Sequence, residues 1–196
     1  MRRLSKPKAA GKKEKNKAPL SPDEVIKGRM KNLAYQEEII SFFTRLITLA
    51  VLLWIIFGMV FGLTPMENDD MSPRISAGDL MLYYRLDREF ISDDIIVFEK
   101  DGQQYTGRIV ARGGDSVEVT DDAELVVNGG IVMDSDIFYF TPKYDENVTY
   151  PVQLAENEYF VLCDYREGAR DSRYFGPVSA DEIKGKVITV IRRSNL

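Results

Sequence analysis

The feature that most constrains this chain is an uninterrupted apolar stretch, LITLAVLLWIIFGMVFGL, from Leu46 to Leu63, which contains no charged side chain. A transmembrane helix needs about 17–25 predominantly apolar residues, and Ile39 to Phe43 extend the stretch at its amino end. Arg45 has a long aliphatic stem, so its guanidinium group can reach the lipid headgroups while the stem stays in apolar surroundings. The sequence therefore predicts a single membrane anchor over residues 39–63.

A cleaved signal peptide is the alternative interpretation of the same stretch. Its apolar region would be shorter, about 7–15 residues, and a small-x-small cleavage site would follow it. The residues that end the stretch and follow it, FGLTPMEN, contain no such site. We therefore predict an uncleaved anchor.

Charge is distributed unequally on the two sides of this anchor. Residues 1–45 hold 12 Lys or Arg and 5 Asp or Glu, a net charge of +7, whereas the rest of the chain holds 14 and 26, a net charge of −12. Cytoplasmic segments beside a membrane span carry an excess of Lys and Arg. We predict a single-pass protein of the cell membrane, with its amino terminus in the cytoplasm and residues 64–196 in an extracellular domain.

The amino-terminal segment is rich in Lys, Arg, Pro, Gly and Ala and has few large apolar residues. Such a composition cannot bury a core, so we predict that residues 1–38 form a basic, disordered tail. Anionic lipid attracts a basic segment next to a membrane span. Membrane lipid is therefore the expected partner of the tail, and no nucleic-acid partner is expected.

Beyond the anchor, short β-rich runs alternate with turn signals. The turn signals are Asp101-Gly102, Gly113-Gly114-Asp115 and Asn128-Gly129-Gly130. The runs between them read DLMLYYRL, DIIVFEK, YTGRIVAR, SVEVT, ELVVNGGIVM, IFYF, EYFVLC and GKVITVIRR. No segment past the anchor has a sustained helical period. The sequence predicts a mainly β, antiparallel domain preceded by one N-terminal transmembrane helix.

The chain contains no histidine, which excludes Ser-His-Asp and Cys-His triads and every His-ligated zinc site. Its single cysteine, Cys163, cannot form an intramolecular disulfide and lies in an apolar run typical of an inert buried thiol. No metal site and no cofactor are expected.

Five motifs in the β-rich region resemble, in the same order, those of the type I signal peptidases. These are membrane-anchored serine proteases with a serine–lysine dyad and a β-rich catalytic domain outside the membrane. The motifs are NDDMSP with its following Gly78-Asp79, then DDIIVF, YTGRIVARGGD, LVVNG, and CDYREGARDSRYFG with its following IKGKV. The residues that resemble the family's structural frame are Met71, Pro73, Gly78, Asp79, Arg108, Asp115, Asp164, Arg166, Asp171, Arg173 and Gly176.

Three positions depart from the family pattern where the family's chemistry lies. By this resemblance the nucleophilic serine corresponds to Asp70, the general-base lysine to Gly107, and the serine that orients the lysine to Ala169. A serine nucleophile needs a base to take its proton, and glycine has no side chain to supply one. A carboxylate is a poor nucleophile towards an amide and would repel a developing oxyanion. We expect no intact catalytic residue in this chain.

Neighbouring residues offer no good replacement for the dyad. Ser72 lies two residues after Asp70 and would project to the same side of an extended chain. It would still lack a base, because Arg108 stays protonated and points to the opposite face of its strand from position 107. An aspartic dyad would need a second carboxylate about 3 Å from the first. The candidates are Asp69, Asp164 and Asp171, but the family resemblance implies that Asp171 pairs with Arg173.

The resemblance also implies a function. Members of the family that lack the serine and the lysine are associated with sortase-built pili of Gram-positive bacteria. We therefore expect a pseudoenzyme that binds an exported polypeptide, with pilin subunits and a sortase as candidate partners, and assists pilus assembly without cleavage. The candidate groove residues are Asp70, Met71, Ser72 and Pro73.

Two other functions stay open at this point. The chain could be an active signal peptidase of altered mechanism that removes signal peptides from exported precursors. It could also be a structural membrane protein that has inherited the fold alone. For Asp70 itself, a role in accepting a cation from the partner stands against simple drift in a site without activity.

Overall fold

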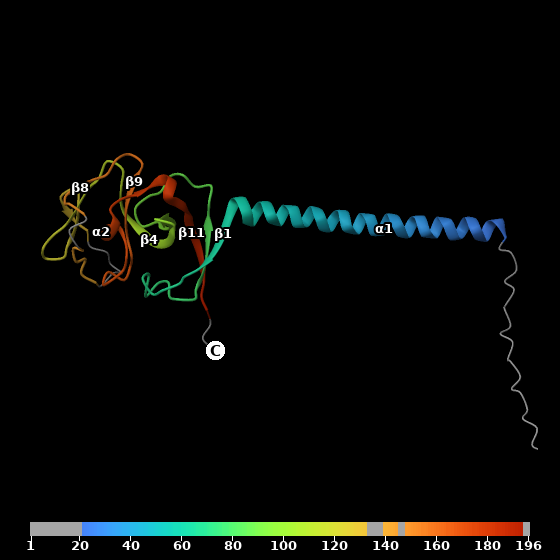
Figure 1. Cartoon of the computed structure of the whole chain (residues 1–196), viewed down its shortest axis with the longest axis horizontal. Helices are drawn as coiled ribbons and strands as arrows, with labels where there is room; N and C mark the ends of the chain where they lie inside the picture. The colour runs from blue at the N-terminus through green and yellow to red at the C-terminus, as the bar shows by residue number, and fades with distance from the viewer. Residues whose placement is uncertain (1–20, 133–138, 145–147, 194–196) are drawn as a thin grey trace, which may run out of the picture. The chain divides into compact units, whose positions relative to one another are not determined.

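The computed structural model describes residues 21–132, 139–144 and 148–193 (Figure 1). It begins with the helix α1, Pro22–Ile55, which continues into a π-helical turn, Ile56–Val60. This helical segment contains an 18-residue window of mean hydropathy 2.3 and is long and apolar enough to cross a membrane. By its contacts the chain divides into two compact units, residues 1–50 and 51–196.

The helix begins earlier than the sequence predicted. The Glu24 carboxylate accepts a hydrogen bond from the Ser21 backbone N–H at 3.0 Å, and the Ser21 hydroxyl accepts one from the Glu24 N–H at 3.4 Å. This reciprocal pair is a capping box, and Pro22 takes the first helical position, where its missing N–H costs nothing. The prediction of disorder is therefore wrong for residues 22–38, and residues 1–20 lie outside the described residues.

The predicted anchor also ends too late. Residues 61–63 belong to strand β1, Phe61–Pro65, which pairs antiparallel with β2, Leu80–Tyr84. Gly62 allows the two strands to approach closely, because a Cβ at this position would lie 2.1 Å from the ring of Tyr83. An apolar run that no polar residue interrupts fits the end of a transmembrane helix and a buried strand equally well. The sequence pattern alone could not separate the two.

The described part of the β domain contains two antiparallel sheets. The larger has seven strands in the order β1-β2-β11-β3-β4-β9-β10, and the smaller has four in the order β7-β6-β5-β8. The remaining strands are β3 Ile95–Lys100, β4 Gln103–Arg112, β5 Ser116–Val119, β6 Leu125–Val127, β7 Gly130–Ile131, β8 Val152–Gln153, β9 Glu158–Leu162, β10 Val178–Ser179 and β11 Ile183–Ile191. The predicted fold class, a mainly antiparallel β domain after one apolar helix, is confirmed.

Two details of the strand prediction differ from the structure. The run IFYF was expected to form a strand, but Tyr139 and Phe140 are irregular and Phe140 is 75% exposed, while its first two residues lie outside the described residues. A short helix, α2 Ser172–Phe175, and a single 3-10 turn, Ala180–Glu182, interrupt the β domain. Both are too short to leave a periodic signal in the sequence.

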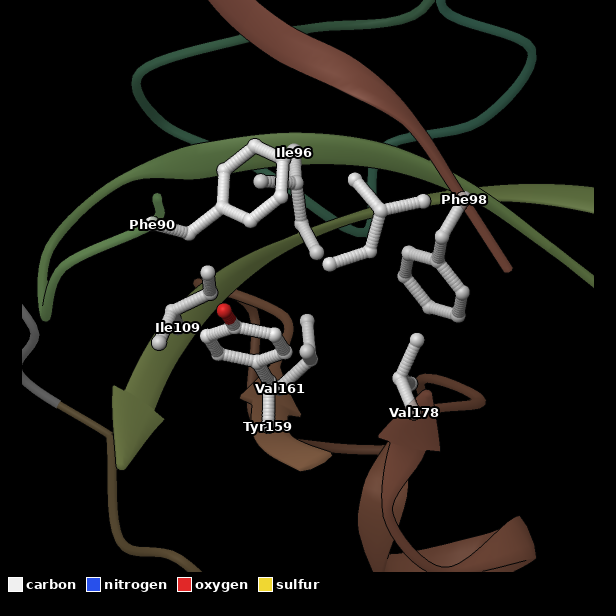
Figure 2. Packing of buried hydrophobic residues seen from close by; sticks show 8 residues of the cluster. Phe90, Ile96, Phe98, Ile109, Tyr159, Val161 and Val178 are labelled. Atoms are coloured by element: carbon white, nitrogen blue, oxygen red, sulfur yellow. The ribbon is translucent and has the colours of Figure 1, made fainter. Parts of the chain in front are cut away.

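The core of the domain consists of three clusters of apolar side chains. Figure 2 shows the first, in which side chains from β3, β4, β9 and β10 point towards one another. The third cluster packs beneath the loop between β1 and β2, and its members are Met66, Met71, Ile75, Met81, Cys163 and Ala169. Full burial of a large apolar side chain contributes about 1.5–3 kcal/mol. This third cluster therefore fixes the loop that carries Asp70.

Candidate functional site

The loop between β1 and β2 is closed at its base by backbone hydrogen bonds. The Met66 N–H donates to the Asp79 carbonyl and the Gly78 N–H donates to the Met66 carbonyl, both at 2.8 Å. Met71 is fully buried, so it anchors the middle of the loop in the third apolar cluster. The residue before it, Asp70, is held at the surface of that cluster.

Asp70 is half-buried and hydrogen-bonded through both its side chain and its backbone. Its Oδ2 accepts a hydrogen bond from Asn68 Nδ2 at 2.7 Å, and its carbonyl accepts one from the Tyr165 N–H at 2.8 Å. Burial raises the pKa of Asp70 above its ordinary value, and the nearby carboxylates of Asp171 and Asp69 raise it further, against the lowering effect of the Asn68 hydrogen bond. Among the described residues, the groups that shift the pKa of Asp70 include no basic side chain.

The three positions at which the family resemblance led us to expect replaced catalytic residues, 70, 107 and 169, lie around one residue, Cys163. Its thiol donates a hydrogen bond to the carbonyl of Thr106, the neighbour of Gly107, at 3.6 Å. It packs in the same apolar cluster as Ala169. Burial raises the pKa of the Cys163 thiol well above its ordinary value, and Asp171 and Asp70 add to this effect. The thiol is therefore a packing group rather than a nucleophile.

Gly107 has no room for a side chain in the present backbone. It lies on β4 opposite Ile96 of β3. An added Cβ would lie 2.6 Å from Cγ1 of Val161 and 3.2 Å from the carbonyl oxygen of Leu162. Any side chain at position 107 therefore requires Val161 or the backbone of β9 to move. This lack of space at position 107 could not be predicted from the sequence.

Arg108, the next residue on β4, forms a buried bidentate ion pair with Asp164. Arg108 Nη2 lies 2.6 Å from Asp164 Oδ2, and Nε donates to Oδ1 at 2.8 Å. Arg108 Nη1 also donates to the Asp93 carbonyl at 3.0 Å. A planar guanidinium matches a carboxylate in this arrangement, which makes such pairs strong and directional. Arg108 thus joins β4 to the segment that follows β9.

A second buried ion pair joins Asp171 and Arg173, as the sequence predicted. Arg173 Nη2 lies 2.8 Å from Asp171 Oδ2, and its Nη1 donates to the carbonyl of Arg166 at 2.8 Å. Asp171 also caps α2 by accepting the Arg173 N–H at 3.0 Å, and its Oδ2 accepts the Cys163 N–H at 3.1 Å. Arg166 is itself buried and donates to the hydroxyl of Thr141 at 3.2 Å. These contacts fix the segment from β9 to α2.

The other predicted frame residues stabilise turns. The Asp79 carboxylate accepts the N–H groups of Ser76 and Arg193, and Asp115 accepts the N–H of Arg112 at 2.9 Å. Gly176 ends α2 with a φ of +81°, a conformation that favours glycine. Gly78, near the end of the loop between β1 and β2, has a φ of +88°, which favours glycine for the same reason.

A small polar pocket of about 50 Å³ lies beside Asp70. One wall is the start of the loop between β1 and β2, and the other is the first part of β4. The lining residues are Pro65, Met66, Glu67, Asn68, Asp70, Gln103, Gln104, Tyr105 and Thr106. They include two carboxylates and three side-chain amides but no serine, cysteine or lysine. The pocket offers room for a few water molecules or one small polar group.

The predicted groove residues do not all reach this pocket. Asp70 lines it, but Met71 is fully buried and belongs to the core. Pro73 lines a different pocket, and Ser72 lines neither of the two. Gln103 and Gln104 were not predicted as site residues, because they lie 33 or more residues from Asp70 and reach the pocket through the pairing of distant strands. Their position, directly after the Asp101-Gly102 turn, was the available signal.

A helix of transmembrane length, an antiparallel β domain and two buried Arg–Asp pairs around the Asp70 loop together define a protein of the signal-peptidase type. The chain belongs to the signal peptidase family, peptidase S26, whose sequence profile matches residues 39–191.

Similar proteins carry two kinds of name. The chain is 26% identical to "Signal peptidase I S" of Bacillus subtilis (strain 168), over 74% of this chain and 84% of the relative. It is 28% identical to "Inactive signal peptidase IA" of Staphylococcus aureus (strain MRSA252), over 72% of this chain and 82% of that relative. A crystal structure of a signal peptidase I from Enterococcus faecalis V583 is 29% identical, with a TM-score of 0.41, and covers 52% of this chain and 97% of that one.

Proposed function

We propose that this chain is a signal-peptidase-like pseudoenzyme that binds an exported polypeptide at the Asp70 pocket and does not cleave it. The single observation that carries this proposal is the composition of the site. The pocket presents the carboxylates of Asp70 and Glu67 and no serine or lysine, and Gly107 has no space for the base that the family uses. The relative named as an inactive signal peptidase supports the same conclusion.

The electrostatics of the pocket favour a cationic ligand group. Burial and two neighbouring carboxylates disfavour the ionised form of Asp70, and the group that acts against this effect is the neutral amide of Asn68. A partly buried carboxylate without a cation gains most from a partner that supplies one. A lysine ammonium group is small enough for a pocket of about 50 Å³ and would meet the oxygens of both carboxylates and of the side-chain amides. The polypeptide partner therefore presents a lysine to this pocket.

The partner class follows from the resemblance to degenerate family members. Those proteins are associated with sortase-built pili, so pilin subunits are the proposed partner and a sortase the second one. In this arrangement the amino-terminal segment lies in the cytoplasm and the β domain lies outside the cell membrane, consistent with the net charges of +7 and −12 on the two sides of the apolar helix.

A second candidate function is signal-peptide removal by an altered mechanism. It is favoured by the relative from Bacillus subtilis, which is named a signal peptidase I. The full chain, purified in detergent and incubated with a secreted precursor, separates the two functions. We expect no cleavage above a buffer control. Cleavage that Ser72→Ala abolishes would overturn the pseudoenzyme proposal.

Binding is tested with the full chain and purified pilin subunits. Asp70→Ala should weaken the affinity by about 1–3 kcal/mol, the usual effect of losing a charged hydrogen bond, while Asp122→Ala, at an exposed position, should leave it unchanged. Pilus polymerisation in cells should follow the same order. Unchanged affinity and normal polymerisation with Asp70→Ala would mean that the aspartate has no role in binding, and no binding to the unaltered chain would favour a purely structural protein.

A further inference from the structure

A side-chain hydrogen bond joins the two walls of the Asp70 pocket. Gln104 Nε2, on β4, donates to Thr64 Oγ1, on β1, at 2.8 Å. Within their sheet, the strands β2, β11 and β3 separate β1 from β4. The sheet therefore curves far enough to bring the end of β1 beside the start of β4, and the pocket lies where these two strands meet.

This hydrogen bond orients the amide group of Gln104. The Thr64 hydroxyl donates to the Pro65 carbonyl at 3.5 Å, so its oxygen acts as the acceptor for Gln104. A glutamine amide has a donor end, the NH2 group, and an acceptor end, the carbonyl oxygen. Because Thr64 engages the donor end, the group that Gln104 offers to a ligand in the pocket is its acceptor, Oε1.

Two other donor groups of the pocket lining are also engaged by protein acceptors. Asn68 Nδ2 donates to Asp70 Oδ2 at 2.7 Å, and the Tyr105 hydroxyl donates to Gln103 Oε1 at 3.2 Å. The lining further contains the carboxylates of Asp70 and Glu67. Together with the glutamine oxygen on β4, these carboxylates provide a ligand with a set of hydrogen-bond acceptors.

An alkylammonium group matches this set of acceptors. It has three N–H donors, no acceptor and a compact shape. A guanidinium group also has donors only, but it is planar and larger, and the pocket has a volume of about 50 Å³. A methylated ammonium group keeps its positive charge but loses N–H donors. The acceptors of the pocket therefore favour the unmodified ammonium group of a lysine.

We infer that Gln104 is a specificity-determining residue of the Asp70 pocket and that Thr64 positions it. Gln104 Oε1 accepts one N–H of the lysine ammonium group of the partner polypeptide, while the carboxylate of Asp70 accepts another. Thr64 acts through Gln104, because it holds the amide in the orientation that presents Oε1. The inference rests on the proposed binding of a polypeptide lysine at Asp70 and adds the residues that recognise its N–H groups.

The test measures the affinity of the full chain, in detergent, for purified pilin subunits. Gln104→Met keeps the length of the side chain but removes the acceptor, so binding should weaken about threefold to tenfold. Gln104→Glu keeps an acceptor and should bind at least as tightly as the unaltered chain. Gln153→Met is the control, because Gln153 is also exposed and its amide also donates to a protein acceptor, but it lies outside the pocket.

A double-mutant cycle tests the role of Thr64. Thr64→Val removes the hydroxyl group and keeps the shape of the side chain, so the amide of Gln104 can rotate and binding should weaken about threefold. In a chain that already carries Gln104→Met, the same substitution should have little further effect. An equal effect of Thr64→Val in both chains would show that Thr64 does not act through Gln104 and would overturn its positioning role.

Chemical modification of the pilin subunits tests the recognition of the N–H groups. Reductive dimethylation of lysine keeps the positive charge and leaves one N–H donor of the three. This modification should weaken binding to the unaltered chain more than binding to the Gln104→Met chain. Equal weakening in the two chains would mean that Gln104 does not recognise the N–H groups, and the inference would be overturned.

The outcomes separate this inference from the proposed function. If Asp70→Ala weakens binding and Gln104→Met does not, the Asp70 pocket binds the polypeptide as proposed and the inference is overturned. If the unaltered chain does not bind pilin subunits, the proposed function fails and the inference fails with it. The unfolding temperature of each variant without pilin verifies that the variant is folded.

Discussion

Asp171 and Arg173 form an ion pair in which neither residue has any exposed surface, with Arg173 Nη2 at 2.8 Å from Asp171 Oδ2. The aspartate also accepts a hydrogen bond from the N–H of Cys163. The pair therefore supports the backbone behind the Asp70 pocket. Because both side chains are fully buried and also bind the backbone, the pair serves to hold the fold.

Removing one partner of this pair should destabilise the domain strongly. Arg173→Met leaves the carboxylate of Asp171 buried and unpaired, so we expect a loss of about 3–5 kcal/mol in the free energy of unfolding. Denaturant unfolding of the full chain in detergent measures the change. Lys143→Ala removes the exposed Lys143–Asp121 pair and serves as the control, with an expected change below about 1 kcal/mol. Equal effects of the two substitutions would contradict a structural role for the buried pair.

A side chain at position 107 should strain the sheet. Gly107→Ala places a Cβ 2.6 Å from Val161 Cγ1, and such overpacking costs about 1–3 kcal/mol. Val161→Ala in the same chain removes the clashing methyl groups, so the double variant should lose less stability than the sum of the two single variants. Strictly additive losses would show that the contact at Val161 is not the cause.

The same contact limits any attempt to introduce a serine–lysine dyad at positions 70 and 107, where the family resemblance expects one. Asp70→Ser with Gly107→Lys supplies both groups, but the Cβ of the new lysine would clash with β9. Ala169 also has no hydroxyl group that could orient the lysine. We expect little or no cleavage of a secreted precursor. Cleavage at a rate near that of an active signal peptidase would show that β9 adjusts more easily than the packing suggests.

The stability of the chain should respond to the charge of Asp70. Its pKa is raised from the ordinary value of 3.8, first by burial, so the folded state binds a proton more tightly than the unfolded state does. The free energy of unfolding therefore falls as the pH rises from this ordinary value through the folded-state pKa. Asp70→Asn should be more stable than the unaltered chain at pH 7, and the difference should vanish below pH 3.8. Unfolding curves of both chains across this range are the measurement, and a less stable Asp70→Asn chain at pH 7 would contradict the burial of an unpaired charge.

The orientation in the membrane can be tested with protease. The positive net charge of residues 1–45 and the negative charge beyond the apolar helix predict that residues 64–196 are outside. Protease added to intact cells with permeable walls should degrade this domain and spare the amino-terminal segment. Complete protection of the domain would place it in the cytoplasm and exclude a role in binding exported polypeptides.

Much of the fold was predictable because its signals are local. Alternating apolar residues and Gly-containing turns indicated the strands, and the family resemblance of the segment around Asp171 and Arg173 indicated their ion pair. The start of the helix was missed because the capping box of Ser21 and Glu24 lies in a segment whose overall composition resembles a disordered tail. There the local signal was stronger than the composition.

The shape of the site was not predictable, because it depends on contacts between distant residues. The walls of the Asp70 pocket come from the loop after β1 and from Gln103 and Gln104 on β4. The lack of space for a side chain at Gly107 depends on the position of Val161 in a neighbouring strand. Sheet order and register determine both features. The residues nearby in the sequence carry no signal of that order or register.

The direct passage from the helix into β1 determines how the β domain can be produced without its anchor. A truncation at residue 64, the boundary that hydropathy suggests, would remove Phe61, Gly62 and Leu63 and leave one side of β2 without its partner. An uncovered strand of this kind promotes aggregation between chains. A soluble fragment should therefore keep Phe61 as its first native residue, and the last apolar residues of the segment belong to the architecture of the domain as much as to its attachment.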